Sequence, residues 1–266
     1  MHSLALIIIH INRMKDLIKS ALYRIGGLRR STASRVIYYH DVFSQRSYTE
    51  MGTPLGAFCR HVDVAKLMGF TFVRDITEAH RQLMICFDDG FRGIWDNRQY
   101  FFENRLCPTV FMPVNLIGKD NYLTRDEILL LQEQGFVFQG HSWNHDNLPH
   151  YSDIDLRHEL WDAKEELQQI LGKEVDSICF PQGYFSDRVI RFSLEAGYKK
   201  LYSSLPGGRF ECIGEGLYSN LICRSLMQGI SLGDFKAILQ GGDSVFRRFR
   251  LKKHLRPDFV PLSLDA

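Results

Sequence analysis

From residue 35 onward, short apolar segments alternate with segments whose apolar residues recur at helical spacing. The apolar segments are rich in Val, Ile, Phe and Tyr, which predicts buried strands. The predicted strands are RVIYYH (35–40), FTFV (70–73), LMICF (83–87), TVFMPV (109–114), FVFQG (136–140), SICF (177–180) and KKLYSS (199–204). The predicted helices cover residues 54–68, 92–105, 124–134, 152–171, 187–196 and 232–240.

Local signals support several of these helix ends. Thr124 is a good N-cap, and Glu127, three residues later, completes a capping box. Gly135, Gly172 and Gly197 follow predicted helices, where glycine commonly ends a helix. Residues 207–223 are rich in glycine and are predicted to be irregular.

Strands that alternate with helices indicate βα units and a parallel sheet. About six or seven such units favour a closed or nearly closed barrel over an open sheet. The sequence therefore predicts one α/β barrel domain over residues 35–245. It is preceded by an N-terminal extension, 1–34, and followed by a basic tail, 246–266, with no clear element after Gly241.

The N-terminal extension joins an apolar run to a basic amphipathic segment. The run LALIIIHI (4–11) is shorter than the roughly 18 residues that span a bilayer, and no convincing signal-peptide pattern surrounds it. Beyond it, apolar residues share one face of a predicted helix: Leu17, Ile18, Ala21, Leu22 and Ile25. Residues 13–30 are expected either to contact an anionic membrane surface or to pack on the domain. Met14 is an alternative start to Met1.

Composition excludes several classes of protein. The chain of 266 residues is 45% hydrophobic and 24% charged, which is ordinary for a globular protein. Its formal net charge of +2 gives no strong field for nucleic acid, so no nucleic-acid partner is expected. The six cysteines show no metal-binding spacing, and Cys86 and Cys179 lie in apolar strands. Buried, reduced thiols are the favoured interpretation, which indicates a reducing compartment.

Polar clusters directly follow four of the predicted strands. They are His40-Asp41, Asp88-Asp89-Gly90, the segment HSWNH (141–145) and Pro181-Gln182-Gly183. In a parallel barrel the carboxyl ends of all strands meet on one face, where catalytic groups collect. Each cluster taken alone is more often structural, but their common position at strand ends predicts a shared site.

The residue types in these clusters suit metal-dependent hydrolysis. Two histidines and one carboxylate are a common zinc set, and His141 and His145 are four residues apart. Asp88 and Asp89 supply one carboxylate for the ion and a second that can take a proton from water. His40 is the candidate acid for the leaving group.

Three of these segments resemble the motifs of NodB-type polysaccharide deacetylases, carbohydrate esterase family 4. The segments are FDDG (87–90), HSWNH (141–145) and FPQG (180–183), in the family's order and with its rough spacing. The segment YYHDV (38–42) is similar to one found in the subgroup that includes poly-N-acetylglucosamine deacetylases. The resemblance covers residues 35–225 and implies a distorted (β/α) barrel, similar to a TIM barrel.

The resemblance also implies roles for individual residues. Asp88 would be the general base, and Asp89, His141 and His145 would hold one divalent metal ion. Zinc suits this set best, and cobalt or nickel would also fit. Pro181 and Gln182 would wall the substrate groove, with the Gln182 N–H near the oxyanion. His40 would be the acid.

Two features depart from the family pattern. Many members carry an Arg that orients the base two residues before the third-motif Pro, where this chain has Cys179. Arg224 is a candidate to replace it from another strand. Many members also supply the acid from a late Leu-x-His segment, and His254 does not fit that pattern.

The predicted function is a metal-dependent polysaccharide deacetylase that removes the N-acetyl group of an N-acetylglucosamine-like sugar, with an N-acetylated glycan as its partner. The departures leave two alternatives: a catalytically inactive glycan-binding or scaffold domain, or a hydrolase of a small non-glycan amide or ester. The expected location is the cytoplasm or the inner face of a membrane.

Overall fold

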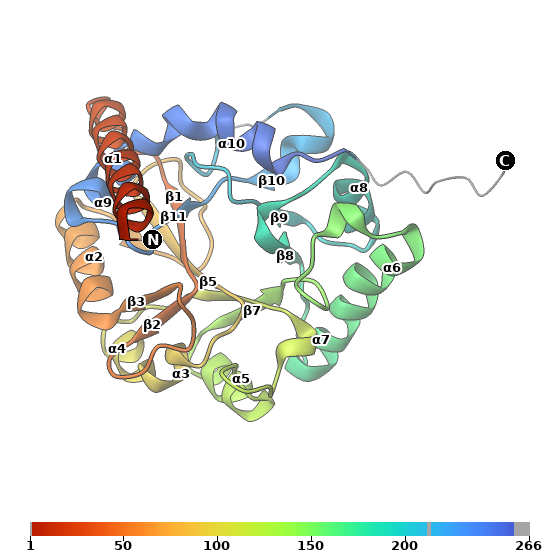
Figure 1. Cartoon of the computed structure of the whole chain (residues 1–266). Coiled ribbons are helices and arrows are strands. Elements are labelled where there is room, and N and C mark those ends of the chain that lie inside the picture. The colour runs from red at the N-terminus through yellow and green to blue at the C-terminus, as the bar shows by residue number, and fades with distance from the viewer. Residues whose placement is uncertain (1, 212–213, 258–266) are drawn as a thin grey trace, which may run out of the picture.

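A single parallel sheet curls around the centre of the protein, and helices surround it (Figure 1). The computed structural model describes residues 2–211 and 214–257. The sheet has nine strands in the order β10-β9-β8-β7-β6-β5-β1-β11, with β4 beside β5, and every pairing is parallel. The strands are β1 (Arg35–Tyr39), β4 (Thr71–Phe72), β5 (Gln82–Asp88), β6 (Thr109–Met112), β7 (Val137–Gly140), β8 (Ser177–Cys179), β9 (Lys200–Tyr202), β10 (Leu221–Ile222) and β11 (Ser225–Leu226).

A second, small sheet pairs β2 (Asp41–Phe43) with β3 (Gly52–Pro54). The α-helices are α1 (His2–Gly27), α2 (Leu55–Leu67), α3 (Gly93–Asp96), α4 (Arg98–Glu103), α5 (Arg125–Glu133), α6 (Asp153–Arg157), α7 (Ala163–Leu171), α8 (Asp187–Glu195), α9 (Leu232–Leu239) and α10 (Arg247–His254). A π-helical segment, η3 (His158–Asp162), joins α6 to α7. The short 3-10 helices are η1 (Val114–Leu116), η2 (Leu148–His150), η4 (Pro181–Gly183), η5 (Gly216–Asn220) and η6 (Gly242–Phe246).

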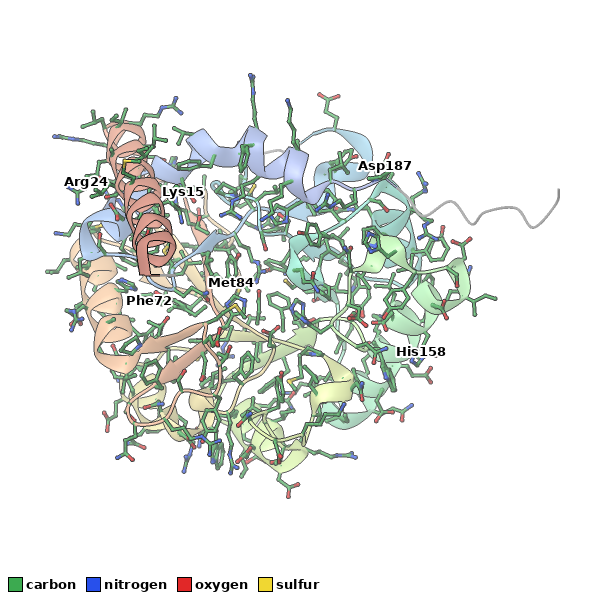
Figure 2. All side chains as sticks on the ribbon, viewed as in Figure 1. Lys15, Arg24, Phe72, Met84, His158 and Asp187 are labelled. Carbon is green, nitrogen blue, oxygen red and sulfur yellow. The ribbon has the colours of Figure 1, made fainter. Side chains whose placement is uncertain are left out.

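The fold confirms the expected distorted (β/α) barrel. Strand β1 is buried at every position, and side chains fill the space inside the ring of helices (Figure 2). The sheet has more strands than the six or seven expected, because β10 lies in the segment that was predicted to be irregular and β11 follows it. Only Cys223 and Arg224 separate β10 from β11, which form the two ends of the strand order. The two edges of the sheet therefore meet at this segment.

Several local signals have the predicted geometry. Thr124 accepts a hydrogen bond from the N–H of Glu127, and the Glu127 side chain accepts one from the N–H of Thr124, which completes the capping box. Gly172 ends α7 in the left-handed conformation, with φ of +61°. Such a φ is strained for residues that carry a Cβ atom, so glycine is favoured here.

The expectation of no clear element after Gly241 is wrong. Residues 242–254 form η6 and α10, and Asp243 of η6 accepts hydrogen bonds from the buried side chains of Arg35 and Ser225. This buried ion pair fastens the C-terminal segment to β1 and β11. A sequence pattern alone does not reveal a long-range pairing of this kind.

Helix α1 is fastened to the barrel through its C-terminal half. Gly26 approaches Gly242 so closely that a Cβ atom on Gly26 would lie 2.6 Å from the Gly242 carbonyl oxygen. Ser20 donates a 2.6 Å hydrogen bond to Asp234 of α9. The predicted apolar face is nevertheless largely exposed, because Leu17, Ile18 and Ile25 keep 64%, 59% and 63% of their surface. The helix thus packs on the domain through residues other than this face.

No helix among the described residues is long and apolar enough to span a membrane.

Candidate active site and metal centre

The polar clusters meet in one cleft at the carboxyl ends of the central strands. The cleft has a volume of about 230 Å³. Six of the predicted site residues line it: His40, Asp88, Asp89, His141, His145 and Gln182. Pro181 is buried beside the cleft and does not line it, and the buried Arg224 reaches Asp88 from the β10–β11 segment.

The two adjacent aspartates occupy different positions because the chain turns between them. Asp88 is the last residue of β5, whereas Asp89 has a φ of +71°. Gly90 follows, also with positive φ, and a Cβ atom there would lie 2.1 Å from the sulfur of Met112. Only glycine fits this turn without displacing Met112. The turn thus separates the two carboxylates, as their predicted roles require.

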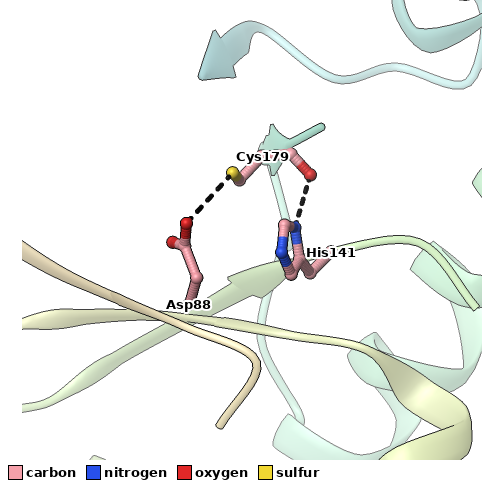
Figure 3. Close-up of side chains that lie close together, drawn as sticks. All are labelled: Asp88, His141 and Cys179. Atoms are coloured by element: carbon pink, nitrogen blue, oxygen red, sulfur yellow. Dashed lines mark hydrogen bonds between the residues drawn. The ribbon is translucent and has the colours of Figure 1, made fainter. Parts of the chain in front are cut away.

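Asp89 faces both histidines of the HSWNH segment. Its Oδ1 atom lies 3.3 Å from Nε2 of His141 and 3.0 Å from Nε2 of His145. Nδ1 of His141 donates a 2.7 Å hydrogen bond to the Cys179 carbonyl oxygen (Figure 3). Nε2 of the same ring is therefore left to face Asp89. Burial raises the pKa of Asp89, but the two imidazoles lower it far more, so the side chain is a carboxylate.

These three side chains fit a divalent metal ion. Their ligand atoms lie within 4.8 Å of one another. Asp89 Oδ1 is buried and accepts no hydrogen bond from the described residues, although two imidazole nitrogens lie close to it. A carboxylate with two imidazoles is a common zinc set that leaves a coordination position open.

A neighbouring group, Asp88, His141 and Cys179, also lies within 4.8 Å but suits a metal ion less well (Figure 3). Burial raises the pKa of the Cys179 thiol well above its usual value, so the sulfur keeps its proton. A thiol must lose its proton to bind a metal ion strongly. Asp88 is engaged by Arg224, so the first group is the better metal site.

Arg224 holds Asp88 through two hydrogen bonds. Its Nη1 and Nη2 atoms donate to Oδ1 and Oδ2 of Asp88 at 2.6 and 2.8 Å. Burial raises the pKa of Asp88, but the Arg224 guanidinium outweighs this effect and holds the pKa below its usual value. Nη2 of Arg224 also lies 2.7 Å from the sulfur of Cys179. Cys179 stands at the sequence position where many family members carry the arginine that orients the base. The expected replacement therefore has the geometry to orient Asp88.

A carboxylate that was absent from the predicted site fixes the HSWNH loop. Glu159 is 1% exposed and accepts hydrogen bonds from the N–H groups of Trp143 and Asn144 and from the Asn144 side chain. It lies in η3, the π-helical segment, and such wider turns often occur at functional sites. No sequence pattern indicates this role, because residues 152–171 have the pattern of a regular helix.

The loop backbone is itself held in uncommon conformations. Ser142, His145 and Gln182 all have positive φ, as Asp89 does. Residues with a Cβ atom rarely adopt such angles unless the surrounding structure imposes them, and they concentrate at functional sites. Ser142 Oγ also accepts a hydrogen bond from the N–H of His145.

His40 follows β1 and is oriented by a residue from beyond β11. Its Nδ1 atom donates a 2.5 Å hydrogen bond to Oε1 of Gln228. The other nitrogen, Nε2, is therefore left for the cleft that His40 lines. Sequence reasoning did not find Gln228, which is 188 residues away along the chain.

His254 also lines the cleft, although its sequence context did not match the family pattern. Nδ1 of His254 donates a 2.9 Å hydrogen bond to the Gly183 carbonyl oxygen. Burial, together with Arg250, lowers the pKa of His254 to about 4. A neutral imidazole with its proton on Nδ1 has no proton on Nε2 to donate. His254 is thus suited to supporting the Gln182–Gly183 turn.

Comparisons with known proteins indicate the family to which this sequence is similar. A family model described as polysaccharide deacetylase matches residues 75–201. The Bacillus subtilis protein YxkH, which bears the name of a polysaccharide deacetylase, is 20% identical over 195 residues, covering 69% of this chain and 68% of that protein.

Solved structures share the fold. A polysaccharide deacetylase from Bacillus cereus superposes with a TM-score of 0.68 and 21% identity, over 78% of this chain and 69% of that one. IcaB from Ammonifex degensii gives a TM-score of 0.65 and 13% identity, over 79% and 98% of the two chains. Residues 75–201 thus match a polysaccharide deacetylase domain, which confirms the resemblance seen in the sequence.

Proposed function

We propose that this protein is a metal-dependent deacetylase that hydrolyses the N-acetyl group of an N-acetylglucosamine-like sugar. The observation that carries the proposal is the convergence of Asp89, His141 and His145 on one point beside Asp88. One set of side chains can hold an ion while the neighbouring carboxylate stays free to move a proton. The polysaccharide deacetylase domain supplies the expected reaction class.

The ion would be held by Asp89, His141 and His145. When bound, a divalent ion acidifies water and polarises a carbonyl group. Zinc suits two imidazoles and a carboxylate best, and cobalt or nickel fits the same ligands. Glu159 supports the ligands by holding the loop that carries both histidines.

Asp88 is the proposed base for the attacking water. Arg224 holds both of its oxygens from one side, which fixes the orientation of the carboxylate and keeps it ionised. The backbone N–H of Gln182, which lines the same cleft, is the proposed donor to the oxyanion that develops on the carbonyl oxygen.

His40 is the proposed acid for the departing amine. Gln228 accepts a hydrogen bond from Nδ1 of His40, so Nε2 is the atom that would carry the transferred proton into the cleft. Because Asp88 ends β5 and His40 follows β1, the two groups come from different segments, and one can accept a proton while the other donates one. The C–N bond then breaks to give acetate and a free amino sugar.

Metal content of the purified chain is the first test. Mass spectrometry should find about one divalent ion per chain after zinc reconstitution, and His145→Ala should lose it. The loaded enzyme should release acetate from N-acetylglucosamine oligomers, whereas Asp88→Asn should keep the ion and lose turnover. His40→Ala should slow turnover without loss of the ion.

Other results would redirect the assignment. If His40→Ala empties the site, His40 is a ligand and the acid lies elsewhere. Asp88→Asn removes the negative charge that pairs with the buried Arg224, so the melting temperature of this variant must be measured together with its activity. A chain that binds no ion after reconstitution would favour the non-catalytic glycan-binding alternative.

A further inference from the structure

A second, larger cavity opens beside the cleft, between α1 and α10. We call this cavity of about 650 Å³ the α1–α10 groove. Figure 1 shows the two helices next to one another beside β1 and β11. Apolar side chains from both sides line the groove: Ile18, Leu22, Leu226, Ile230, Phe246 and Phe249. A groove of this size and composition is typical of a site for a small apolar ligand.

The groove and the cleft share a boundary. Tyr38, Ser204, Arg250 and Lys253 line both cavities. The two cavities are therefore next to one another, so a molecule with its sugar in the cleft is close enough to reach the groove along these side chains. The cleft itself holds only about 230 Å³, so any larger substrate must continue beyond it.

The groove carries a surplus of positive charge. Lys15 and Lys19 extend from α1, and Arg250 and Lys253 extend from α10. The acid that lines the groove within residues 2–211 and 214–257, Asp243, is already paired with Arg35. Burial and the neighbouring Arg250 lower the pKa of Lys19. Cations gathered in this way favour an anionic group on the ligand.

We propose that the substrate is a membrane glycolipid in which a phosphodiester joins an N-acetylated sugar to a long apolar chain. This inference rests on the proposed function, because the sugar occupies the same cleft. The phosphodiester lies at the shared boundary, near Arg250 and Lys253. The apolar chain fills the α1–α10 groove, between Ile18 and Phe249.

The order of chemical groups along the groove supports this substrate over a free polysaccharide. A neutral glycan strand offers hydroxyl groups, which gain nothing from walls of Ile18, Leu226 and Phe249. A long hydrocarbon chain gains binding free energy from each methylene group that it buries there. An apolar chain alone would gain nothing from Arg250 and Lys253 at the boundary, whereas a phosphodiester would accept charge-assisted hydrogen bonds from them.

Two soluble probes test the proposal with the full chain loaded with zinc. They are phosphodiesters of N-acetylglucosamine with either methanol or decanol, used below the concentration at which micelles form. Calorimetry should show the decyl probe binding at least about tenfold more tightly than the methyl probe. Acetate release should show the same preference in kcat/KM.

Matched variants test where on the protein the decyl chain of the probe binds. Ile18→Glu, in the groove, should remove most of the decyl preference. Leu17→Glu, on the same helix but outside the groove lining, should keep it. Arg250→Gln should remove the preference for the decyl phosphodiester over a neutral decyl glycoside, whereas Arg248→Gln, which does not line the groove, should not. Equal melting temperatures would show that the variants fold.

Each contrary outcome overturns a distinct claim. Equal binding and turnover of the two probes would overturn the glycolipid and leave the deacetylase assignment intact. Tight, groove-dependent binding with no acetate release from either probe or from N-acetylglucosamine oligomers would overturn the proposed function and the glycolipid's role as a substrate. A dimer that Ile18→Glu dissociates would assign the groove to a second copy of the chain and overturn the proposal.

Discussion

Asp41 is an acid in an environment that disfavours its charge. It follows His40, is fully buried, and accepts a hydrogen bond from the N–H of Tyr48 at 3.2 Å. Burial raises its pKa from 3.8 to about 7. In the unfolded chain the carboxyl loses its proton at lower pH than in the folded protein. Folding stability from this group is therefore greatest below pH 4 and is lost as the pH rises toward 7.

Replacing Asp41 by Asn should flatten this pH dependence. The pKa difference corresponds to a stability change of up to about 4 kcal/mol in the wild type between pH 4 and 8. Urea unfolding at both pH values measures it, and Asp120→Asn, at an exposed acid, is the control. An Asp41→Asn protein that loses as much stability as the wild type between these pH values would show that other groups carry the effect.

Glu159 links an irregular turn of helix to the metal ligands. Its two carboxylate oxygens accept three hydrogen bonds from Trp143 and Asn144, which lie between the two histidines. An amide side chain at position 159 would place its NH2 group opposite another N–H donor in at least one of these three contacts. The loop would then hold His141 and His145 less firmly.

We therefore expect Glu159→Gln to weaken zinc binding by about 10- to 100-fold, as changes to groups that orient metal ligands commonly do. Competition with a chromophoric chelator measures the affinity, and Glu165→Gln, at an exposed position in α7, serves as the control. Unchanged zinc affinity in the Glu159 variant would mean that the loop keeps its conformation without this carboxylate.

At the scale of elements, α1 presents apolar side chains without a partner. Leu17 and Ile25 are 64% and 63% exposed, whereas Tyr23 on the opposite side is buried. Lys15 and Arg24 extend from the same helix (Figure 2). Apolar and basic residues together favour contact with an anionic membrane surface, where both contribute to binding. We propose that residues 13–30 make this contact.

Vesicle sedimentation tests the contact. The protein should bind vesicles that contain phosphatidylglycerol more strongly than neutral ones, and high salt should reduce the binding. The double variant Leu17→Asp and Ile25→Asp should bind at least about tenfold more weakly. Leu67→Asp, at an exposed apolar position on α2, is the control. Equal binding by all three proteins would remove α1 from the contact.

At the scale of the molecule, the sequence predicts best what is local or periodic. Alternating apolar segments and helix signals predict most strands and helices. Because His40, Asp88 and His141 follow or end parallel strands, the sequence also predicts that they share one face, and all three line the cleft. The position of Arg224 is harder to predict from the sequence, because it depends on where the two edges of the sheet meet. Gln228 bonds to His40, and His254 bonds to Gly183, across 188 and 71 residues of sequence, and no local pattern encodes such distances.

The proposed metal centre also joins segments of the barrel that are far apart in the chain, since Asp89 follows β5 and both histidines follow β7. A ligand that binds only the folded protein stabilises it, by about 2.7 kcal/mol at a concentration 100 times its Kd. For a domain of this size that corresponds to a rise in melting temperature of roughly 5–10 °C.

Calorimetric melts with and without zinc should show this rise, and a chelator should reverse it. His145→Ala should melt at the same temperature in both conditions. If zinc raised the melting temperature of the variant as much as that of the wild type, the ion would bind elsewhere, and the cleft would lose its assignment as the metal centre.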